Sequence, residues 1–307
     1  MKYKILSLLA VILFASYPTI SKVVLAHNSP LVVIFITGAL SALVVLFVYG
    51  ILPEVKKLIR FKKQEPYLFL VAFLAGALAP TCNLFGLAHS SVLNYVLISS
   101  LQIPIAAFLS AVILQEQITP SYIISLFFLA LGMIIYSTQF FQSTFHFSWN
   151  DLFFVVAAFS FALSDVLYKK KVSHLPHEMV LIVRNTVGAV IIFLVMTFLS
   201  VESGLQVSFD TESLIGMVLI VLFPIIIAQG LWYFSLEKIK NIEAALLNSL
   251  YPIFATLIAF FILHESILWY QILGGGIMIG GLMISQVHFS HHNMYADHLR
   301  LHNFKHH

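Results

Sequence analysis

The sequence predicts an all-α integral membrane protein with ten transmembrane helices, built as two inverted five-helix repeats with both termini in the cytoplasm. Three observations predict this fold class. Hydrophobic residues make up 60% of the 307 residues and charged residues only 9%, whereas a soluble domain carries roughly a quarter charged residues. Apolar stretches of about 20 residues, the length that crosses a bilayer, follow one another along the chain. A phrase in the first half also recurs in the second half.

Turn residues and charges separate ten candidate helices. The first follows Lys2 and Lys4 and has no convincing small-x-small cleavage site. A second apolar stretch comes directly after it, so we expect a mature helix and not a signal peptide. The expected spans are 5–24, 30–51, 66–88, 92–113, 119–139, 150–169, 178–200, 213–234, 243–262 and 266–287.

Lysine and arginine are distributed unequally between the two sides of the membrane. With ten helices, fourteen of the sixteen fall on one side, Lys22 alone lies at the other, and Arg184 lies inside the seventh span. Cytoplasmic loops carry an excess of Lys and Arg, so both termini are expected in the cytoplasm of a cell (inner) membrane protein. Adding or dropping one helix would scatter the basic clusters to both sides, which favours the count of ten.

The repeated phrase reads IPIAAFLSAVILQEQI in the first half and YPIFATLIAFFILHESI in the second. Pro104 and Pro252 lie 148 residues apart, and Glu116 and Glu265 lie 149 apart. Because each half holds five helices, the two copies enter the membrane from opposite sides and are related by a pseudo-two-fold axis in its plane. Inverted repeats of this kind suit alternating access.

These paired phrases resemble the EamA-type repeat of the drug/metabolite transporter superfamily, in which the proline lies in the fourth helix of each five-helix unit. The resemblance covers residues 3–138 and 149–286, the two expected repeats, and leaves a His-rich cytoplasmic tail at 288–307. It implies a transporter for amino acids, drugs, nucleotide derivatives or other metabolites, with efflux as the family-level expectation.

Three pairs of positions depart from the family pattern. The pairs, each joining one position of the first unit to its counterpart in the second, are Gln115 and His264, Thr37 and Arg184, and Phe14 and Phe161. The first pair stands where the family usually has glycine before the glutamate. The second pair has the family's arginine in the second unit only. The third pair has phenylalanine in place of tryptophan.

Asp165 and Arg184 are ionisable residues inside predicted spans. An ionisable residue at the centre of a membrane helix costs roughly 2.5–3.5 kcal/mol on insertion scales, so such residues are usually paired or line water. From the helix rise, they lie roughly 6 and 9 Å from the cytoplasmic end of consecutive helices, and we expect them to be near neighbours. They predict an ion pair or charge cluster at the inner end of a transport route. The alternative is a structural pair, or an arginine that extends to the interface.

Amide and phenol side chains inside the spans predict a polar cavity near the membrane midplane. Each single amide has an alternative use as a hydrogen bond between helices. Together with the charged pair, the expected substrate-binding residues are Asp165, Arg184, Asn83, Asn94, Gln102, Gln229, Tyr233 and Asn248. The chain has 28 Phe and 12 Tyr, which allows stacking or cation–π contact with a substrate.

Five prolines lie inside predicted spans, and each removes a backbone hydrogen bond and favours a kink. Because Pro104 and Pro252 recur in both halves, we expect them to shape or gate the cavity; a packing bend is the alternative. In the last helix, Gly276 and Gly280 have the small-xxx-small spacing used for close helix packing, with another helix of the same chain as the expected partner.

The expected function is a secondary transporter that moves a small metabolite, amino-acid-like or drug-like, by alternating access. No Walker A, GxSxG or HExxH motif is present, so no enzymatic activity, no cofactor and no resident metal are expected. The expected partners are a small-molecule substrate and the lipid bilayer, without nucleic acid. A coupling proton or ion and a homodimer remain open.

A second class of function is a metal-cation or metal-regulated carrier. Seven of the thirteen His residues fall within 288–307, and His298 and His302 lie four residues apart, a spacing that can place both on one metal. The alternative is a solvated tail that becomes more positive as the pH falls. A membrane scaffold that transports nothing is a third class.

Overall fold

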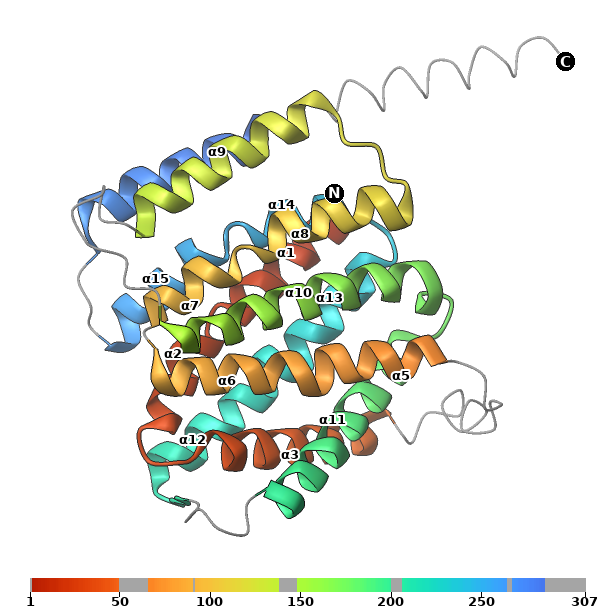
Figure 1. Cartoon of the computed structure of the whole chain (residues 1–307), viewed down its shortest axis with the longest axis vertical. Coiled ribbons are helices and arrows are strands. Elements are labelled where there is room, and N and C mark those ends of the chain that lie inside the picture. Colours follow the sequence, from red (N-terminus) through yellow and green to blue (C-terminus); the bar gives the residue numbers. More distant parts are fainter. Residues whose placement is uncertain are drawn as a thin grey trace, which may run out of the picture. The chain divides into compact units, whose positions relative to one another are not determined.

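The computed structural model describes residues 2–49, 66–90, 92–137, 148–199, 206–263 and 267–284, and every regular element in these ranges is helical (Figure 1). The chain divides into two compact units. The larger comprises residues 1–116 and 146–267, and the smaller comprises residues 117–145 and 268–307. The predicted all-α class is therefore confirmed for the described part of the chain.

The larger unit contains elements from both halves of the sequence. In the first half they are α1 (Lys2–Phe14), α2 (Tyr17–Leu25), α3 (Pro30–Tyr49), α5 (Pro66–Ala72), η1 (Phe73–Leu78), α6 (Ala79–His89), α7 (Val92–Ser99), α8 (Gln102–Leu109) and η2 (Ser110–Leu114). In the second half they are η3 (Trp149–Asp151), α10 (Leu152–Leu167), η4 (Tyr168–Val172), α11 (His177–Leu199), α12 (Thr211–Ile220), η5 (Val221–Ala228), α13 (Gln229–Leu236), α14 (Asn241–Asn248) and α15 (Tyr251–Leu263). The smaller unit contains α9 (Pro120–Ser137) and the helix Trp269–Ile284.

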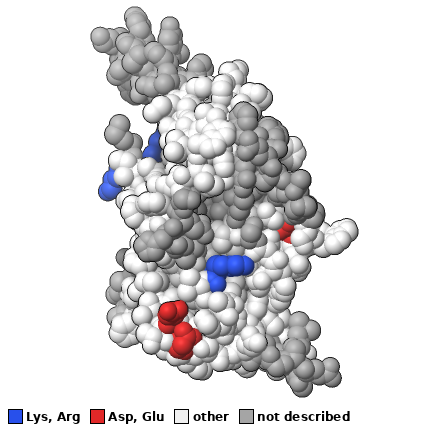
Figure 2. Space-filling model, turned by 90° about the vertical axis from the view of Figure 1, so that its left-hand side faces the viewer, with Lys and Arg blue, Asp and Glu red and all other residues white. Residues whose placement is uncertain are grey.

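Among the described residues, eight helical segments are long and apolar enough to cross a membrane, and two shorter apolar helices are Pro120–Tyr136 and Trp269–Ile284. Large apolar side chains such as Phe47 and Phe198 are 75% and 80% exposed. Figure 2 shows a face on which uncharged atoms prevail and charged side chains are few. A surface of this kind is suited to lipid. The count of ten transmembrane helices and their orientation stay predictions.

Each of the five prolines inside a long segment lies at or near an interruption of the α-helix. Residues 15–16 separate α1 from α2 ahead of Pro18, 100–101 separate α7 from α8 ahead of Pro104, and 249–250 separate α14 from α15 ahead of Pro252. Proline has no N–H to donate and its ring crowds the carbonyl four residues earlier, so the helix opens on its N-terminal side. The predicted kinks are confirmed.

The remaining two prolines accompany π-helical stretches. The stretch η1 lies directly before Pro80, and η5 contains Pro224. A π turn reassigns backbone hydrogen bonds from i−4 to i−5, so it accommodates a missing N–H inside a helix, and such bulges are frequent at functional sites. The two stretches occupy the third helix of each predicted repeat.

Two glycines let η1 and α11 approach to backbone contact. A Cβ on Gly76 would lie 2.3 Å from the Arg184 carbonyl oxygen, and a Cβ on Gly188 would lie 2.3 Å from the Gly76 carbonyl oxygen. Neither distance is compatible with a side chain, because backbone atoms cannot move away as the end of a flexible side chain can. This crossing, which the sequence analysis did not identify, fixes the level of Arg184 beside η1.

The small-residue face of the last helix is not the one that we predicted. In the smaller unit a Cβ on Gly274 would lie 2.5 Å from the Gly132 carbonyl oxygen, and a Cβ on Gly281 would lie 2.8 Å from Phe128 Cβ. Among the described residues, no atom lies within 4 Å of a Cβ built on Gly276 or Gly280. The expected packing within one chain is therefore made by Gly274 and Gly281, which lie seven residues apart and share a helix face.

Gln115 explains one departure from the family pattern. Its φ of 56° lies in the left-handed region, where it ends η2 and turns the chain toward Glu116. Glycine adopts this conformation without a steric penalty. The glycine that the family usually has before this glutamate therefore serves the backbone turn.

The Gly76 crossing yields a stability prediction. We expect Gly76→Ala to lower the stability of the protein by about 1–3 kcal/mol, because the methyl group must separate η1 from the Arg184 backbone. Gly276→Ala is the matched control, since its methyl group meets open space and alanine favours a helix by up to about 1 kcal/mol. Thermal unfolding of the detergent-solubilised variants measures both, and equal unfolding temperatures would contradict the close crossing.

Candidate functional site

A cavity of about 170 Å³ lies inside the larger unit. All eight long apolar segments contribute to its wall, from Phe14 at the end of α1 to Tyr251 at the start of α15. The wall includes Ala75 and Gly76 of η1 and Pro224 and Ile225 of η5, so both π-helical stretches face the cavity. The interruptions at the prolines therefore lie where a bound molecule would meet them.

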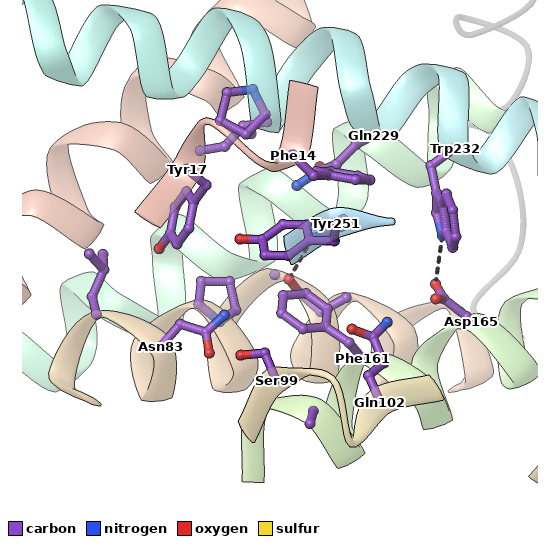
Figure 3. Close-up of a pocket in the computed structure, with 18 of the residues that line it drawn as sticks. Phe14, Tyr17, Asn83, Ser99, Gln102, Phe161, Asp165, Gln229, Trp232 and Tyr251 are labelled. Carbon is purple, nitrogen blue, oxygen red and sulfur yellow. Dashed lines mark hydrogen bonds between the residues drawn. The ribbon is translucent and has the colours of Figure 1, made fainter. Parts of the chain in front are cut away.

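Six of the eight predicted substrate-binding residues line this cavity, namely Asp165, Arg184, Asn83, Gln102, Gln229 and Asn248. Figure 3 shows Asp165 at one end beside Trp232, and Tyr17 and Asn83 toward the other end. Asn94 and Tyr233 are not part of the wall, and neither are Pro104 and Pro252. The binding and gating roles of all ten residues stay predictions.

Asp165 lies on α10 and is 8% exposed. Its Oδ1 accepts a hydrogen bond of 3.2 Å from Trp232 Nε1 on α13. The carboxylate also faces a second, smaller pocket of about 10 Å³, whose wall includes Asn241 and Asn248. Asp165 is one of the residues that line both pockets, together with Gln102, Ile103, Trp232 and Asn248.

Arg184 lies on α11, is 5% exposed, and is held mainly by other protein groups. Its Nη1 donates to the Tyr233 hydroxyl at 2.9 Å, and its Nη2 donates to the Ala75 carbonyl oxygen at 2.8 Å. With the amide of Gln229 turned so that its oxygen faces the guanidinium, Nη2 also donates to Gln229 at 2.9 Å. The guanidinium lies over the rings of Phe161 and Tyr233, at 6.0 and 5.7 Å from their centroids.

The expected ion pair between Asp165 and Arg184 is not formed. Both residues face one cavity, as their shared depth suggested, but no ion pair of 4.0 Å or less joins them in the described part of the chain. Consecutive residues of α13 occupy the two charges instead, because Trp232 binds the carboxylate and Tyr233 binds the guanidinium. Tyr233 thus accepts a hydrogen bond from Arg184 but does not itself line the cavity.

The far end of the cavity is uncharged and aromatic. The Tyr251 hydroxyl donates to the Tyr95 hydroxyl at 3.3 Å, and Asn83 Nδ2 approaches the same oxygen at 3.5 Å. At the Asp165 end, Trp232 packs edge-on against Phe14, with ring centroids 6.0 Å apart. Tyr17, Tyr233 and Tyr251 are the tyrosines expected from the sequence near the cavity, and Tyr17 and Tyr251 line it. The count of 28 Phe and 12 Tyr does not by itself identify which of the others do.

Asn94 belongs to a polar cluster at one end of the bundle and not to the cavity. Its Nδ2 donates to Asp151 Oδ2 at 3.2 Å, and Ser90 Oγ donates to Asp151 Oδ1 at 2.6 Å. Lys22 Nζ donates to the carbonyl oxygens of Leu87 and Ser90, at 2.6 and 2.8 Å. We call Lys22, Ser90, Asn94 and Asp151 the first clasp; it joins α2, α6, α7 and η3.

A second polar cluster contains Glu116, Lys169 and Asn241. The Glu116 carboxylate accepts from the backbone N–H groups of Asn241 and Ile242 at 2.9 and 3.0 Å, so it caps the N-terminus of α14. Lys169 Nζ lies 3.6 Å from Glu116 Oε1 and donates to the Ile239 carbonyl oxygen. We call these three residues the second clasp; it joins η4, the segment after η2 and the start of α14.

The two clasps are related by the repeat. Lys22 and Lys169 lie 147 residues apart, as do Asn94 and Asn241, and Phe14 and Phe161 have the same spacing. In each clasp a lysine of the first helix of a repeat binds carbonyl oxygens at the end of that repeat's third helix. The carboxylates are not related in this way, because Asp151 starts the sixth span and Glu116 follows the fourth.

Other predicted charged residues lie away from the cavity wall. Glu243 pairs with Lys4 at 3.4 Å, at the start of α14. Within the described ranges, no group of three or more His, Cys, Asp or Glu residues is placed to hold a metal ion. Glu265, His264 and the His-rich tail at 288–307 lie outside the described residues.

Comparisons with known proteins connect this architecture to a family. A model of the EamA-like transporter family matches residues 1–138 and 148–286. An uncharacterized transporter of Synechocystis sp. is 24% identical over 244 residues, which cover 76% of this chain and 68% of that relative. An uncharacterized transporter of Archaeoglobus fulgidus is 25% identical over 136 residues, 44% of this chain and 46% of the relative.

The fold also has a counterpart among solved structures. A crystal structure of another protein superposes with a TM-score of 0.75 and 14% sequence identity, covering 93% of this chain and 96% of that one. At this identity the likeness concerns the fold alone.

The second clasp yields a stability prediction. We expect Glu116→Ala to lower stability by about 1–3 kcal/mol, because it leaves two N–H groups of α14 and the Lys169 ammonium without their acceptor. Glu116→Gln keeps one acceptor oxygen and should fall between. Glu212→Ala is the control, since Glu212 is exposed in the first turn of α12. Thermal unfolding in detergent checks the series, and a loss as small as that of the control would contradict the capping role.

Proposed function

We propose that this chain, which belongs to the EamA-like transporter family, is a secondary transporter that moves a small metabolite across the membrane by alternating access. The family match and the relatives named as transporters make it a multi-pass membrane transporter, not an enzyme, with a small molecule as substrate. Alternating access, export and a substrate that is amino-acid-like or drug-like are the proposed additions.

One observation carries the proposal: a cavity enclosed by all eight long apolar segments, with polar residues of both halves in its wall. Phe14 and Phe161 both face it, as do Thr37 and Arg184, and each pair is 147 residues apart. Transporters built from inverted repeats bind substrate near the midplane, at the interface between the repeats and next to discontinuous helices. The interrupted helices around this cavity fit that plan.

The clasps support the proposed topology of ten helices and two inverted repeats. The first clasp contains only residues that the Lys/Arg distribution assigns to the outside, and the second only residues assigned to the cytoplasm. Leaving out any one span between Lys22 and Asn241 would mix the two groups. The proposed repeats are 3–138 and 149–286, with both termini in the cytoplasm.

We propose that the clasps are the two gates. Each fastens helices from different parts of the bundle at one end through a lysine, an asparagine and a carboxylate, so breaking it frees that end to open. Pro104 and Pro252 are proposed to act with them, because the interruptions ahead of these prolines divide the helices that start at Asn94 and Asn241.

Cysteine accessibility tests alternating access without knowledge of the substrate. Cys82 is the only cysteine, so Cys82→Ala provides a background in which Ser99→Cys, on the cavity wall, is the single thiol. We expect a membrane-impermeant thiol reagent to label this cysteine from either side, in right-side-out and in inside-out vesicles. Ser7→Cys, fully buried on α1 away from the cavity wall, is the control that should stay unlabelled.

Variants of the two clasps test which clasp closes which side of the cavity. Lys169→Met should increase the labelling rate from the cytoplasmic side, and Lys22→Met should increase it from the outside, because each loses the contacts that close its own end. Labelling from one side only, unchanged by both variants, would contradict alternating access and favour a scaffold that transports nothing.

A further inference from the structure

The two charges at the cavity are engaged to different extents by the protein. Three N–H donors of Arg184 are used within the protein, on Tyr233, Ala75 and Gln229. Its Nε is buried without a partner among the described residues. A guanidinium has five N–H donors in a fixed fork, and binding a carboxylate well requires two parallel donors of that fork. Arg184 therefore has little left with which to grip an anionic group.

Asp165 is in the opposite condition. It accepts one described hydrogen bond, from Trp232, whereas an ionised carboxylate has about four acceptor positions. It faces both the main cavity and the smaller pocket. No described cation lies within 4.0 Å of it. Of the two charged groups in the cavity wall, the carboxylate therefore has more unused hydrogen-bonding capacity for a ligand.

The surroundings of Asp165 suit an ammonium group. Trp232, which donates its indole N–H to the carboxylate, also presents an aromatic ring beside it, whereas the Phe161 ring one turn earlier on α10 already has the Arg184 guanidinium 6.0 Å from its centroid. Aromatic faces attract cations through their quadrupole, and Trp is the strongest of them. A ligand carboxylate placed here would meet the charge of Asp165 at close range, which costs free energy in a medium of low dielectric constant.

The size of the cavity limits the rest of the ligand. Its volume of about 170 Å³ is close to that of an engineered cavity of about 150 Å³ that binds benzene. A single ring or a comparable apolar body fills such a space. The uncharged part of the cavity is placed to receive it, where Figure 3 shows Tyr17, Asn83 and Tyr251.

We infer that the substrate of this cavity is a compact organic amine, whose ammonium binds the Asp165 carboxylate and whose apolar body lies between the aromatic walls. A carboxylate on the substrate is not required. Arg184 acts as a positioning residue, which ties η1, α11 and α13 together around the cavity. This inference rests on the proposed function, because it assigns the ligand of the same transport cavity.

Three probes with one phenyl ring separate the charges: 2-phenylethylamine carries the amine only, 3-phenylpropanoate the carboxylate only, and phenylalanine both. Binding to the purified full chain is measured by calorimetry. We expect the amine to bind about tenfold to hundredfold more tightly than the carboxylate, the range of one charge-assisted hydrogen bond. We expect phenylalanine to bind no more tightly than the amine. Tighter binding of either carboxylate-bearing probe, or binding of none of the three, would overturn the inference.

Variants locate the interaction. Asp165→Asn should weaken binding of the amine about tenfold or more, because it removes the charge and keeps the shape. Glu212→Gln is the matched control, since Glu212 is an exposed carboxylate in the first turn of α12, away from the cavity wall and from both clasps, and its loss should leave amine affinity unchanged. Thermal unfolding without ligand shows that both variants are folded. Equal losses of affinity in both would also overturn the assignment to Asp165.

The failure of this inference and the failure of the proposed function differ in outcome. The labelling of Ser99→Cys from both sides needs no ligand. A chain that is labelled from both sides but prefers 3-phenylpropanoate is an alternating-access transporter with a different substrate. A chain that binds the amine at Asp165 but is labelled from one side only is a binding protein of the membrane.

Discussion

The rest of the structure depends on one constraint, that backbone polar groups inside a membrane must find partners within the protein. Each internal proline breaks this rule locally, because it removes an N–H. The structure accommodates the missing N–H in two ways. The helix is interrupted ahead of Pro104 and Pro252, and a π-helical stretch lies at or next to Pro80 and Pro224. Irregular backbone is tolerated at this depth only when it is buried or lines a cavity. Ala75, Gly76 and Pro224 do line one, so the cavity and the interruptions depend on each other.

The charged residues follow from the same constraint. Arg184 could not be left in an apolar setting, and the crossing at Gly76 and Gly188 brings its guanidinium to the Ala75 carbonyl oxygen, while α13 supplies the Tyr233 hydroxyl. An arginine so fully engaged organises the wall more than it binds a ligand. Trp232, its neighbour on α13, holds Asp165 with a single hydrogen bond. Two neighbouring residues of α13 therefore contact the two charged groups, and Asp165 keeps more unused hydrogen-bonding positions for a ligand than Arg184 does.

The sequence was sufficient for the helical fold, for the interruptions at the prolines and for several polar residues of the cavity wall, because hydropathy, proline chemistry and helix rise are local properties. Depth along the helices brought Asp165 and Arg184 to one cavity. The side of the helix on which a residue faces could not be predicted so well. Tyr233 turns behind Arg184, Asn94 turns toward Asp151, and Gly274 and Gly281 pack where Gly276 and Gly280 were expected. In an apolar helix the sequence does not reveal which face contacts lipid and which contacts protein, because both environments favour the same residues.

The clasps show what duplication did and did not preserve. Lysine and asparagine are shared by both ends at a spacing of 147 residues, but the carboxylate comes from different helices. Asp151 accepts hydrogen bonds from the side chains of Ser90 and Asn94 and from the Ser148 backbone N–H, whereas Glu116 accepts from two backbone N–H groups of α14 and pairs with Lys169. In the proposed alternating-access cycle, these unlike contacts give the outward-open and inward-open conformations different free energies. The conformation with the lower free energy then predominates in the absence of a ligand. Substitutions in one clasp can shift the populations of the two conformations while the residues of the cavity wall stay unchanged.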